Sequence, residues 1–576
     1  MDFLTLPDQT SPPDGSSSRT NPVTFHTSIT QVQNELSFFQ EAGTPPAGRA
    51  EQINPMSSPA PETDQTTRGL AAQLPRNLAA NIAYFLVNII IGVLLVPYFI
   101  NTLGVAAYGI IPLATSITGY VAIVVQSLNA AVSRFLTIDL QRGDYTVANK
   151  TFNTALFGLT VVILLMVPVI LVVAYFAPAI FHVPAGQETG AVLLFLGVSA
   201  AFLIRSWSGN FTVQLFAYNR LDLQNLVNLT NLIVQTGLIV LLFTLLGPDL
   251  GLIGGAYLAG AVVASGVAIV LARRVCPYLR ISIGSFDRKR VRDLCGMGGW
   301  VVFDQIGALL FHQIDLIIVN LLFGATSAGE YAIALQWAIL LRAIAGVLSG
   351  VLTPTILSCY ARKQTETLIQ VTKSAVKLMG LALALPIGLV CGLGPLLLTV
   401  WVGEEFAFLG PLIVLLTVHL AVNLAVLPLF PINVAYNRVR VPGIVTFFMG
   451  FGNFGLAVAL PLLTGLGYYG VAAAGAIVLT LKNAFFTPWY ATRVLGVGTH
   501  TFTRSMLPGI VATGLIGVAA ATLGTILSLP ALVTLAVAGA AITLVYLVVV
   551  WELGLNGFER GIFESYLPPA LRRIIV

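Results

Sequence analysis

Apolar residues in this chain come in long runs. From Leu78 onward, fourteen runs bounded by glycine, proline or charge are long enough to cross a bilayer, because about 20 helical residues match a hydrocarbon layer of about 30 Å. They cover roughly 78–100, 109–133, 152–177, 190–217, 225–247, 251–272, 297–322, 328–356, 373–399, 409–435, 442–464, 468–490, 505–527 and 530–551. The pattern predicts an all-α polytopic membrane protein with 14 transmembrane helices.

The first twelve runs form two copies of one six-helix unit. Residues 93–104 align with residues 313–324 at an offset of 220. The tetrapeptide AYNR at 217–220 recurs at 435–438, so the offset shifts by only two residues over that distance. Duplicated membrane bundles usually place a substrate site between their halves, and a central cavity is therefore expected here.

These features divide the chain into four predicted regions. Residues 1–72 are rich in proline, serine, threonine and acidic residues, a composition typical of disorder. The regions are a disordered acidic cytoplasmic tail (1–72), an N-terminal six-helix bundle (73–278), a C-terminal six-helix bundle (279–496), and two extra helices with a cytoplasmic C-terminal tail (497–576).

Composition and charge narrow the class of protein. Hydrophobic residues make up 57% and charged residues 9% of the chain, against about 25% charged in soluble domains. All but three of the 29 lysines and arginines fall in the tails or at one side of the predicted membrane, which places both termini in the cytoplasm. The net charge of +5 lies in short loops and indicates no nucleic-acid partner. Neither a catalytic triad nor a metal-ligand spacing is found, so the chain is not expected to be an enzyme.

The three remaining cations lie inside predicted spans. They are Arg205 in the fourth run, Arg342 in the eighth and Lys482 in the twelfth. Because an intramembrane charge is costly, each needs a partner on another helix, water in a cavity, or an anionic ligand. Arginine pairs with phosphate through two parallel hydrogen bonds and lysine acts as a point charge, so a diphosphate would fit these three residues.

Polar residues on the predicted helices indicate what lines the cavity. Thr115, Thr118, Gln126 and Asn129 recur at helical spacing on one face of the second run, and a polar face does not point at lipid. The repeat aligns Ala122 of this face with Arg342, and Arg205 aligns with Asn423 in the tenth run. Such a stripe could also serve only for packing between helices.

Two acids in the seventh run complete the candidate site. Asp304 and Asp315 are eleven residues apart, three helical turns, and therefore share one face. Either could bind a coupling Na⁺ or H⁺, or could neutralise one of the three cations. No other cofactor is expected.

The ordered set of loop sequences resembles the polysaccharide flippase family, which exports O-antigen and teichoic acid precursors within the multidrug/oligosaccharidyl-lipid/polysaccharide exporter superfamily. The matching segments are LGVAAYGI at 103–110, RGDYTVANKTFNTAL at 142–156, the AYNR before the fifth run, and FDRKRVRDLCGMGG at 286–299. No Walker motif is present, so ATP is not expected to be the direct energy source.

The resemblance implies a lipid-linked oligosaccharide on a polyprenyl diphosphate. It would be moved from the inner to the outer leaflet of the cytoplasmic membrane by alternating access, driven by an ion gradient or the membrane potential. Implied partners are membrane lipids and a polysaccharide polymerase or glycosyltransferase assembly. One alternative is a flippase for a peptidoglycan precursor. A multidrug exporter is a less favoured alternative. A hypothesis of a different class is a scaffold that acts through the acidic tail.

Overall fold

The computed structural model describes residues 63–291, 305–311 and 313–566. Residues 73–576 form one compact unit, separate from residues 1–72, so most of the predicted tail lies outside the described residues. Every regular element in the described ranges is a helix, which confirms the all-α class. Twelve of these helices are long and apolar enough to cross a membrane.

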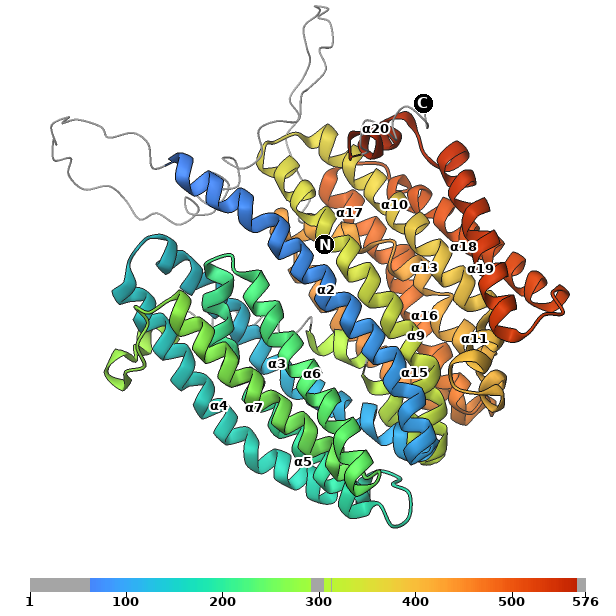
Figure 1. Ribbon diagram of the computed structural model, residues 1–576. Coiled ribbons are helices and arrows are strands. Elements are labelled where there is room, and N and C mark those ends of the chain that lie inside the picture. Colours follow the sequence, from blue (N-terminus) through green and yellow to red (C-terminus); the bar gives the residue numbers. More distant parts are fainter. Residues whose placement is uncertain (1–62, 292–304, 312, 567–576) are drawn as a thin grey trace, which may run out of the picture. The chain divides into compact units, whose positions relative to one another are not determined.

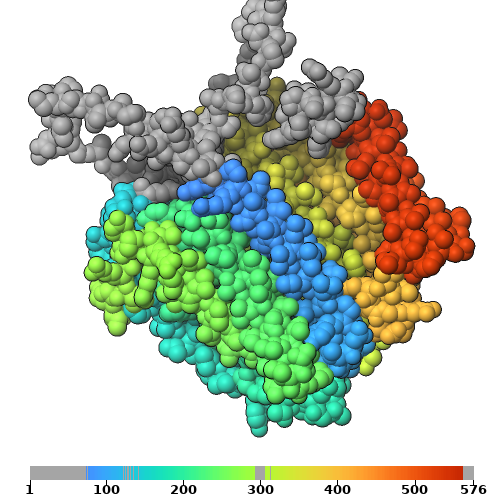
Figure 2. Space-filling model, viewed as in Figure 1, coloured from blue at the N-terminus to red at the C-terminus, as the bar shows by residue number. Residues whose placement is uncertain are grey.

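The first half of the chain contains six helices (Figure 1). They are α2 (Thr63–Leu103), α3 (Val105–Gln141), α4 (Tyr145–Ile180), α5 (Glu188–Ala217), α6 (Leu221–Leu246) and α7 (Leu250–Val275). Helix α5 is central, in contact with α3, α4 and α7, and α6 packs on α7. Helix α2 is the most exposed of the six, and Figure 2 shows it as a ridge along the surface. Its N-terminal half is tied to α6, because Asn77 accepts a hydrogen bond of 3.1 Å from the backbone of Asp222.

The second half repeats this plan with more breaks. Its elements are α9 (Ile314–Ala361), α10 (Thr365–Gly392), α11 (Gly394–Trp401), η3 (Glu404–Leu409), α12 (Gly410–Thr417), α13 (Leu420–Asn423), η4 (Leu427–Leu429), α14 (Phe430–Ala435), α15 (Arg440–Thr464), α16 (Tyr468–Leu481), η5 (Lys482–Phe486) and α17 (Thr487–Leu495). The predicted seventh and eighth runs meet in α9, where Gly324 interrupts the helix, and the second run falls on α3. Counted this way, the twelve apolar helices are compatible with fourteen spans.

The duplication is visible in the backbone. Left-handed residues occur at matching places in the two halves, where one helix ends and the next begins. The pairs are Gly104 with Gly324 (φ 85° and 87°), Gly143 with Lys363 (φ 71° and 56°) and Asn219 with Asn437 (φ 54° and 51°). Their separations of 220, 220 and 218 residues match the sequence repeat. Since glycine and asparagine tolerate this conformation best, the repeat has kept the turns as well as the helices.

The two halves meet where α3 crosses α9. Gly109 and Gly329, 220 residues apart, lie against each other, and a Cβ on Gly109 would come 2.5 Å from the backbone nitrogen of Gly329. Residues that are related by the repeat and touch each other must lie close to its pseudo-two-fold axis. The crossing is near the Gly104 and Gly324 turns, and we call this end of the bundle the turn end.

Two further connections join the halves at the turn end. The backbone of His182, between α4 and α5, donates to Asn320 Oδ1 at 2.9 Å, and Asn320 Nδ2 donates back to the carbonyl of His182 at 3.2 Å. Trp401, at the end of α11, donates from its indole nitrogen to the carbonyl of Val93 at 2.8 Å. His182 and Trp401 therefore each bind the opposite half of the chain.

The buried apolar clusters follow the same division. The largest cluster draws residues from both halves, among them the fully buried Ile110, Leu194 and Tyr331. Toward the opposite end, one cluster around Phe152 belongs to the first half. Another around Phe502 belongs to the second half and to α18 (Thr501–Ile526). We call this the basic end, because Arg142, Arg273, Arg362 and Arg438 lie there. Among the described residues, the halves thus share one core at the turn end and have separate cores at the basic end.

The last elements pack on the second half. They are α18 (Thr501–Ile526), α19 (Ala531–Val549), η6 (Val550–Gly554) and α20 (Gly557–Tyr566). Helix α18 lies along α10, and Tyr546 of α19 donates to the carbonyl of Leu381 at 2.7 Å. Helix α20 is held by Glu559, which is 1% exposed and forms a salt bridge of 2.7 Å with Lys377 of α10.

Replacing Glu559 with alanine is expected to release α20 from the bundle. The carboxylate also accepts a hydrogen bond from the backbone of Asn556 at 2.9 Å, so the change removes a helix cap together with a buried ion pair. We expect a loss of about 2–4 kcal/mol in the free energy of unfolding. The check is the melting temperature in detergent, with Glu552→Ala, an exposed acid nearby, as the control. Equal melting of the two variants would show that the ion pair does not hold α20.

Candidate functional site

Arg342 shares α9 with an acid that lies far away in the sequence. The break at Gly324 turns the chain, so that the segment beginning with Asp315 runs beside the segment that carries Tyr331 and Arg342. Tyr331 donates from its hydroxyl to Asp315 Oδ2 at 3.2 Å, and Asp315 is within electrostatic range of Arg342. Asp315 and Tyr331 are buried, whereas Arg342 keeps part of its surface accessible.

Asp315 and Asn453 of α15 each carry a buried acceptor oxygen in this region. Neither Asp315 Oδ1 nor Asn453 Oδ1 of α15 receives a hydrogen bond from any described residue, although both are buried. A Cβ on Gly475 of α16 would lie 3.5 Å from Asp315 Oδ2 and 3.9 Å from Asn453 Oδ1, so glycine leaves both side chains room. The Asn453 amide nitrogen is occupied, because it donates to the carbonyl of Leu310 at 2.8 Å. Buried acceptors without donors are suited to bind a cation or a proton.

A hydrogen-bonded chain of side chains begins at His419 in the second half. His419 is within electrostatic range of Arg342 and accepts from Asn423 Nδ2 at 2.6 Å. Asn483 donates to Asn423 Oδ1 at 3.1 Å and accepts from the hydroxyl of Thr487 at 3.0 Å. The structure therefore brings the predicted residues Arg342 and Asn423 into one polar network.

Lys482 stands next to this network in the chain. It is buried, and its Nζ lies 5.7 Å from the centre of the Phe430 ring, a cation–π distance. Lys482 also begins η5, a turn of π-helix between α16 and α17. Such turns often occur at functional sites, because the extra residue redirects the neighbouring side chains.

Arg205 belongs to α5 of the first half. Its Nη2 donates to Asn228 Oδ1 of α6 at 2.8 Å, and within the described ranges no group accepts from its buried Nη1. Tyr84 of α2 is within electrostatic range. Arg205 thus belongs to the first half of the chain, and Arg342 and Lys482 belong to the second half.

The predicted polar stripe on α3 is bonded mainly to its own helix. Thr115 donates to the carbonyl of Pro112 at 2.9 Å, and Thr118 donates to that of Thr115 at 2.6 Å. Asn129 lies against Gly209 of α5, where a Cβ would come 3.3 Å from its amide nitrogen. The side chain of Gln126 and the whole of Asp304 lie outside the described residues. A role for this stripe in lining a cavity stays a prediction.

Comparison with known proteins identifies the family. A family described as polysaccharide biosynthesis protein matches residues 74–359. The chain is 33% identical over 431 residues to the uncharacterized membrane protein EpsK of Bacillus subtilis (strain 168), covering 75% of this chain and 85% of that protein.

Two solved structures show the same fold at low identity. The lipid II flippase MurJ in an inward closed conformation has a TM-score of 0.58 at 14% identity, covering 83% of this chain and 98% of that one. An inward-facing multidrug resistance MATE family transporter of the MOP superfamily has a TM-score of 0.54 at 15% identity, covering 75% and 95%. With its relative in Bacillus and its family match, the chain belongs to the polysaccharide biosynthesis protein family.

Proposed function

We propose that the protein is a flippase for a polyprenyl-diphosphate-linked oligosaccharide used to build a cell-surface polysaccharide. The observation that carries the proposal is Arg342, a partly accessible arginine inside a membrane helix and the start of a polar network. A guanidinium in that position suits a passing diphosphate, and the hydroxyl and amide groups of the network suit sugars. Arg205 and Lys482 would act on the phosphates or sugars at other stages of the passage.

The distribution of contacts supports alternating access. The halves are joined at the turn end and have separate cores at the basic end, the arrangement expected when a carrier is closed on one side. The positive-inside rule puts the basic end, and with it both termini, in the cytoplasm. In this orientation the substrate enters from the inner leaflet and leaves at the outer leaflet, and a polymerase or glycosyltransferase assembly would be a partner of the protein.

Transport of purified protein in vesicles tests the proposal. A lipid-linked oligosaccharide placed in one leaflet should become accessible in the other only when the protein is present. Faster movement of a peptidoglycan lipid precursor would favour the alternative that the shared fold with the lipid II flippase suggests. Export of a cationic drug without movement of either lipid would overturn both hypotheses. Deletion of residues 1–70 distinguishes a carrier from a scaffold that acts through the tail, because a carrier keeps its transport after the deletion.

A coupling cation is the second part of the proposal. Asp315 and Asn453 offer one carboxylate and one amide oxygen that receive no hydrogen bond from the described residues, a set that suits Na⁺ or a proton on Asp315. The alternative is that Asp315 only neutralises Arg342. Because the same carboxylate faces both the cation site and Arg342, binding of the cation would change the charge that the arginine experiences.

Replacing Asp315 with asparagine is expected to remove the dependence of transport on an ion gradient. Transport by Asp315→Asn should fall to about the rate measured without a gradient, since the neutral amide cannot hold a cation as a carboxylate does. The measurement is flipping in vesicles with and without a Na⁺ or pH gradient, and Glu404→Gln, an exposed acid at the turn end, is the control. Full stimulation of the variant by the gradient would exclude Asp315 as the coupling residue.

A further inference from the structure

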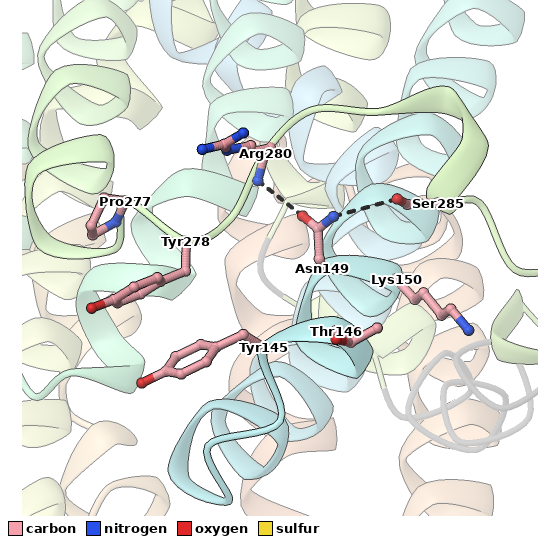
Figure 3. A pocket seen from close by; sticks show the side chains of 8 residues that line it. All are labelled: Tyr145, Thr146, Asn149, Lys150, Pro277, Tyr278, Arg280 and Ser285. Carbon is pink, nitrogen blue, oxygen red and sulfur yellow. Dashed lines mark hydrogen bonds between the residues drawn. The ribbon is translucent and has the colours of Figure 1, made fainter.

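The segment that follows α7 at the basic end is bound firmly to α4. The backbone of Arg280 donates to Asn149 Oδ1 at 2.9 Å, and the backbone of Ser282 donates to Asn153 Oδ1 at 2.8 Å. Figure 3 shows Asn149 linking Arg280 and Ser285 of this segment. We call residues 277–288 the α7 loop. Its backbone is held in place, so the exposure of its side chains is a fixed feature of the surface.

Two adjoining pockets lie between the α7 loop and the first half. The first has a volume of about 430 Å³ and is lined by Tyr145, Thr146, Asn149, Lys150, Pro277, Tyr278, Arg280 and Ser285. The second has a volume of about 330 Å³ and is lined by Phe152, Phe211, Gln214, Arg273, Pro277, Leu279, Arg280 and Ile281. Both linings contain cations and, among the residues that the structure describes, neither contains an acid, so the pockets favour an anion.

The second pocket is the better anion site. In Figure 3 the side chains of Arg280 and Lys150 point in different directions, so they do not converge on one anion in the first pocket. Arg280 also lines the second pocket, where Arg273 of the last turn of α7 joins it. Gln214, only 2% exposed, adds an amide to the same lining. Two guanidinium groups and an amide match the oxygens of a phosphate.

The surface beside this pocket is apolar. Ile281, Ile283 and Phe286 of the α7 loop are 48%, 79% and 41% exposed. The loop begins where α7 leaves the membrane, at the depth where lipid headgroups meet acyl chains. A free phosphate ion would gain nothing from these three side chains, whereas the chains of a lipid would cover them.

We propose that the second pocket binds the phosphate of an anionic phospholipid, with its acyl chains along Ile281, Ile283 and Phe286. The site is separate from Arg342 and its network. A lipid bound there connects the last turn of α7 to the loop that leads into the second half.

Native mass spectrometry of the full chain tests this proposal. The protein is released from detergent micelles that contain phosphatidylglycerol or phosphatidylcholine. We expect the wild-type protein to retain phosphatidylglycerol preferentially. In the double variant Arg273→Gln with Arg280→Gln, the preference for phosphatidylglycerol over phosphatidylcholine should fall by about fivefold or more for each arginine removed. The matched control is Arg288→Gln with Lys289→Gln, which removes two exposed cations that line neither pocket.

The outcomes distinguish a bound lipid from a free anion and from general charge attraction. Equal losses in the double variant and its control would show general attraction to the basic end and would overturn the site. Displacement of phosphatidylglycerol by an equal concentration of inorganic phosphate would overturn the lipid assignment in favour of a free phosphate. Arg280→Lys, which keeps the charge but not the two-pronged geometry, should bind at an intermediate level. The readout is binding, so it does not depend on whether the protein flips an oligosaccharide.

Discussion

Replacing Arg342 with glutamine is expected to abolish transport while the protein remains in the membrane. The variant loses charge-assisted hydrogen bonds to a phosphate, worth about 2 kcal/mol or more, which corresponds to at least about a thirtyfold lower rate. Glutamine keeps much of the side-chain length, so the packing of α9 should survive. The measurement is flipping of a lipid-linked oligosaccharide in vesicles, with the amount of protein per vesicle determined in parallel.

A second variant separates phosphate binding from charge pairing. Arg342 is within electrostatic range of Asp315, so its removal also leaves that carboxylate with one fewer neighbouring cation. If Arg342 only neutralises Asp315, then Arg342→Gln combined with Asp315→Asn should restore exchange measured without an ion gradient. If Arg342 binds the phosphate, the double variant should stay as inactive as Arg342→Gln alone. Arg342→Lys should keep part of the activity, because the charge remains. Normal flipping by Arg342→Gln would exclude the diphosphate assignment.

The helices and the repeat could be predicted because each depends on residues close together in the chain. Span length follows from local runs of apolar residues, and the offset of 220 follows from direct comparison of two segments. The repeat also explains why Gly104 and Gly324 have nearly the same backbone conformation. The role of Asp304 stays a prediction, since this residue lies outside the described residues.

Contacts between helices could not be predicted in the same way. The approach of Asp315 to Tyr331 and Arg342 depends on how Gly324 turns α9, and a single sequence does not contain the register between the two segments. Asn453 was missed as a partner of Asp315, although it is a polar residue inside an apolar helix and could have been singled out for that reason. Helical spacing alone could not tell whether the α3 stripe faces a cavity or a neighbouring helix, and Asn129 lies against α5.

Replacing Gly329 with alanine is expected to separate the two halves at the turn end. The added methyl group would collide with the carbonyl oxygen of Val105, and backbone atoms at a helix crossing cannot rotate away as a side chain can. Overpacking of this kind costs about 1–3 kcal/mol, even though alanine is the better helix former. The expected result is a lower melting temperature together with a shift toward the state in which the turn end is open.

The control lies on the same helix. A methyl group on Gly346 of α9 would lie more than 4 Å from every described neighbour outside its own helix, so Gly346→Ala should melt at the same or a slightly higher temperature. Opening of the turn end can be followed with His182→Cys and Asn320→Cys, placed where hydrogen bonds of 2.9 Å and 3.2 Å join the halves. Cross-linking of this pair should slow in the Gly329→Ala background and stay unchanged in the Gly346→Ala background. If both backgrounds cross-link and melt alike, the Gly109–Gly329 crossing does not hold the halves together, and the closed turn end must depend on the shared apolar core and the Trp401 contact.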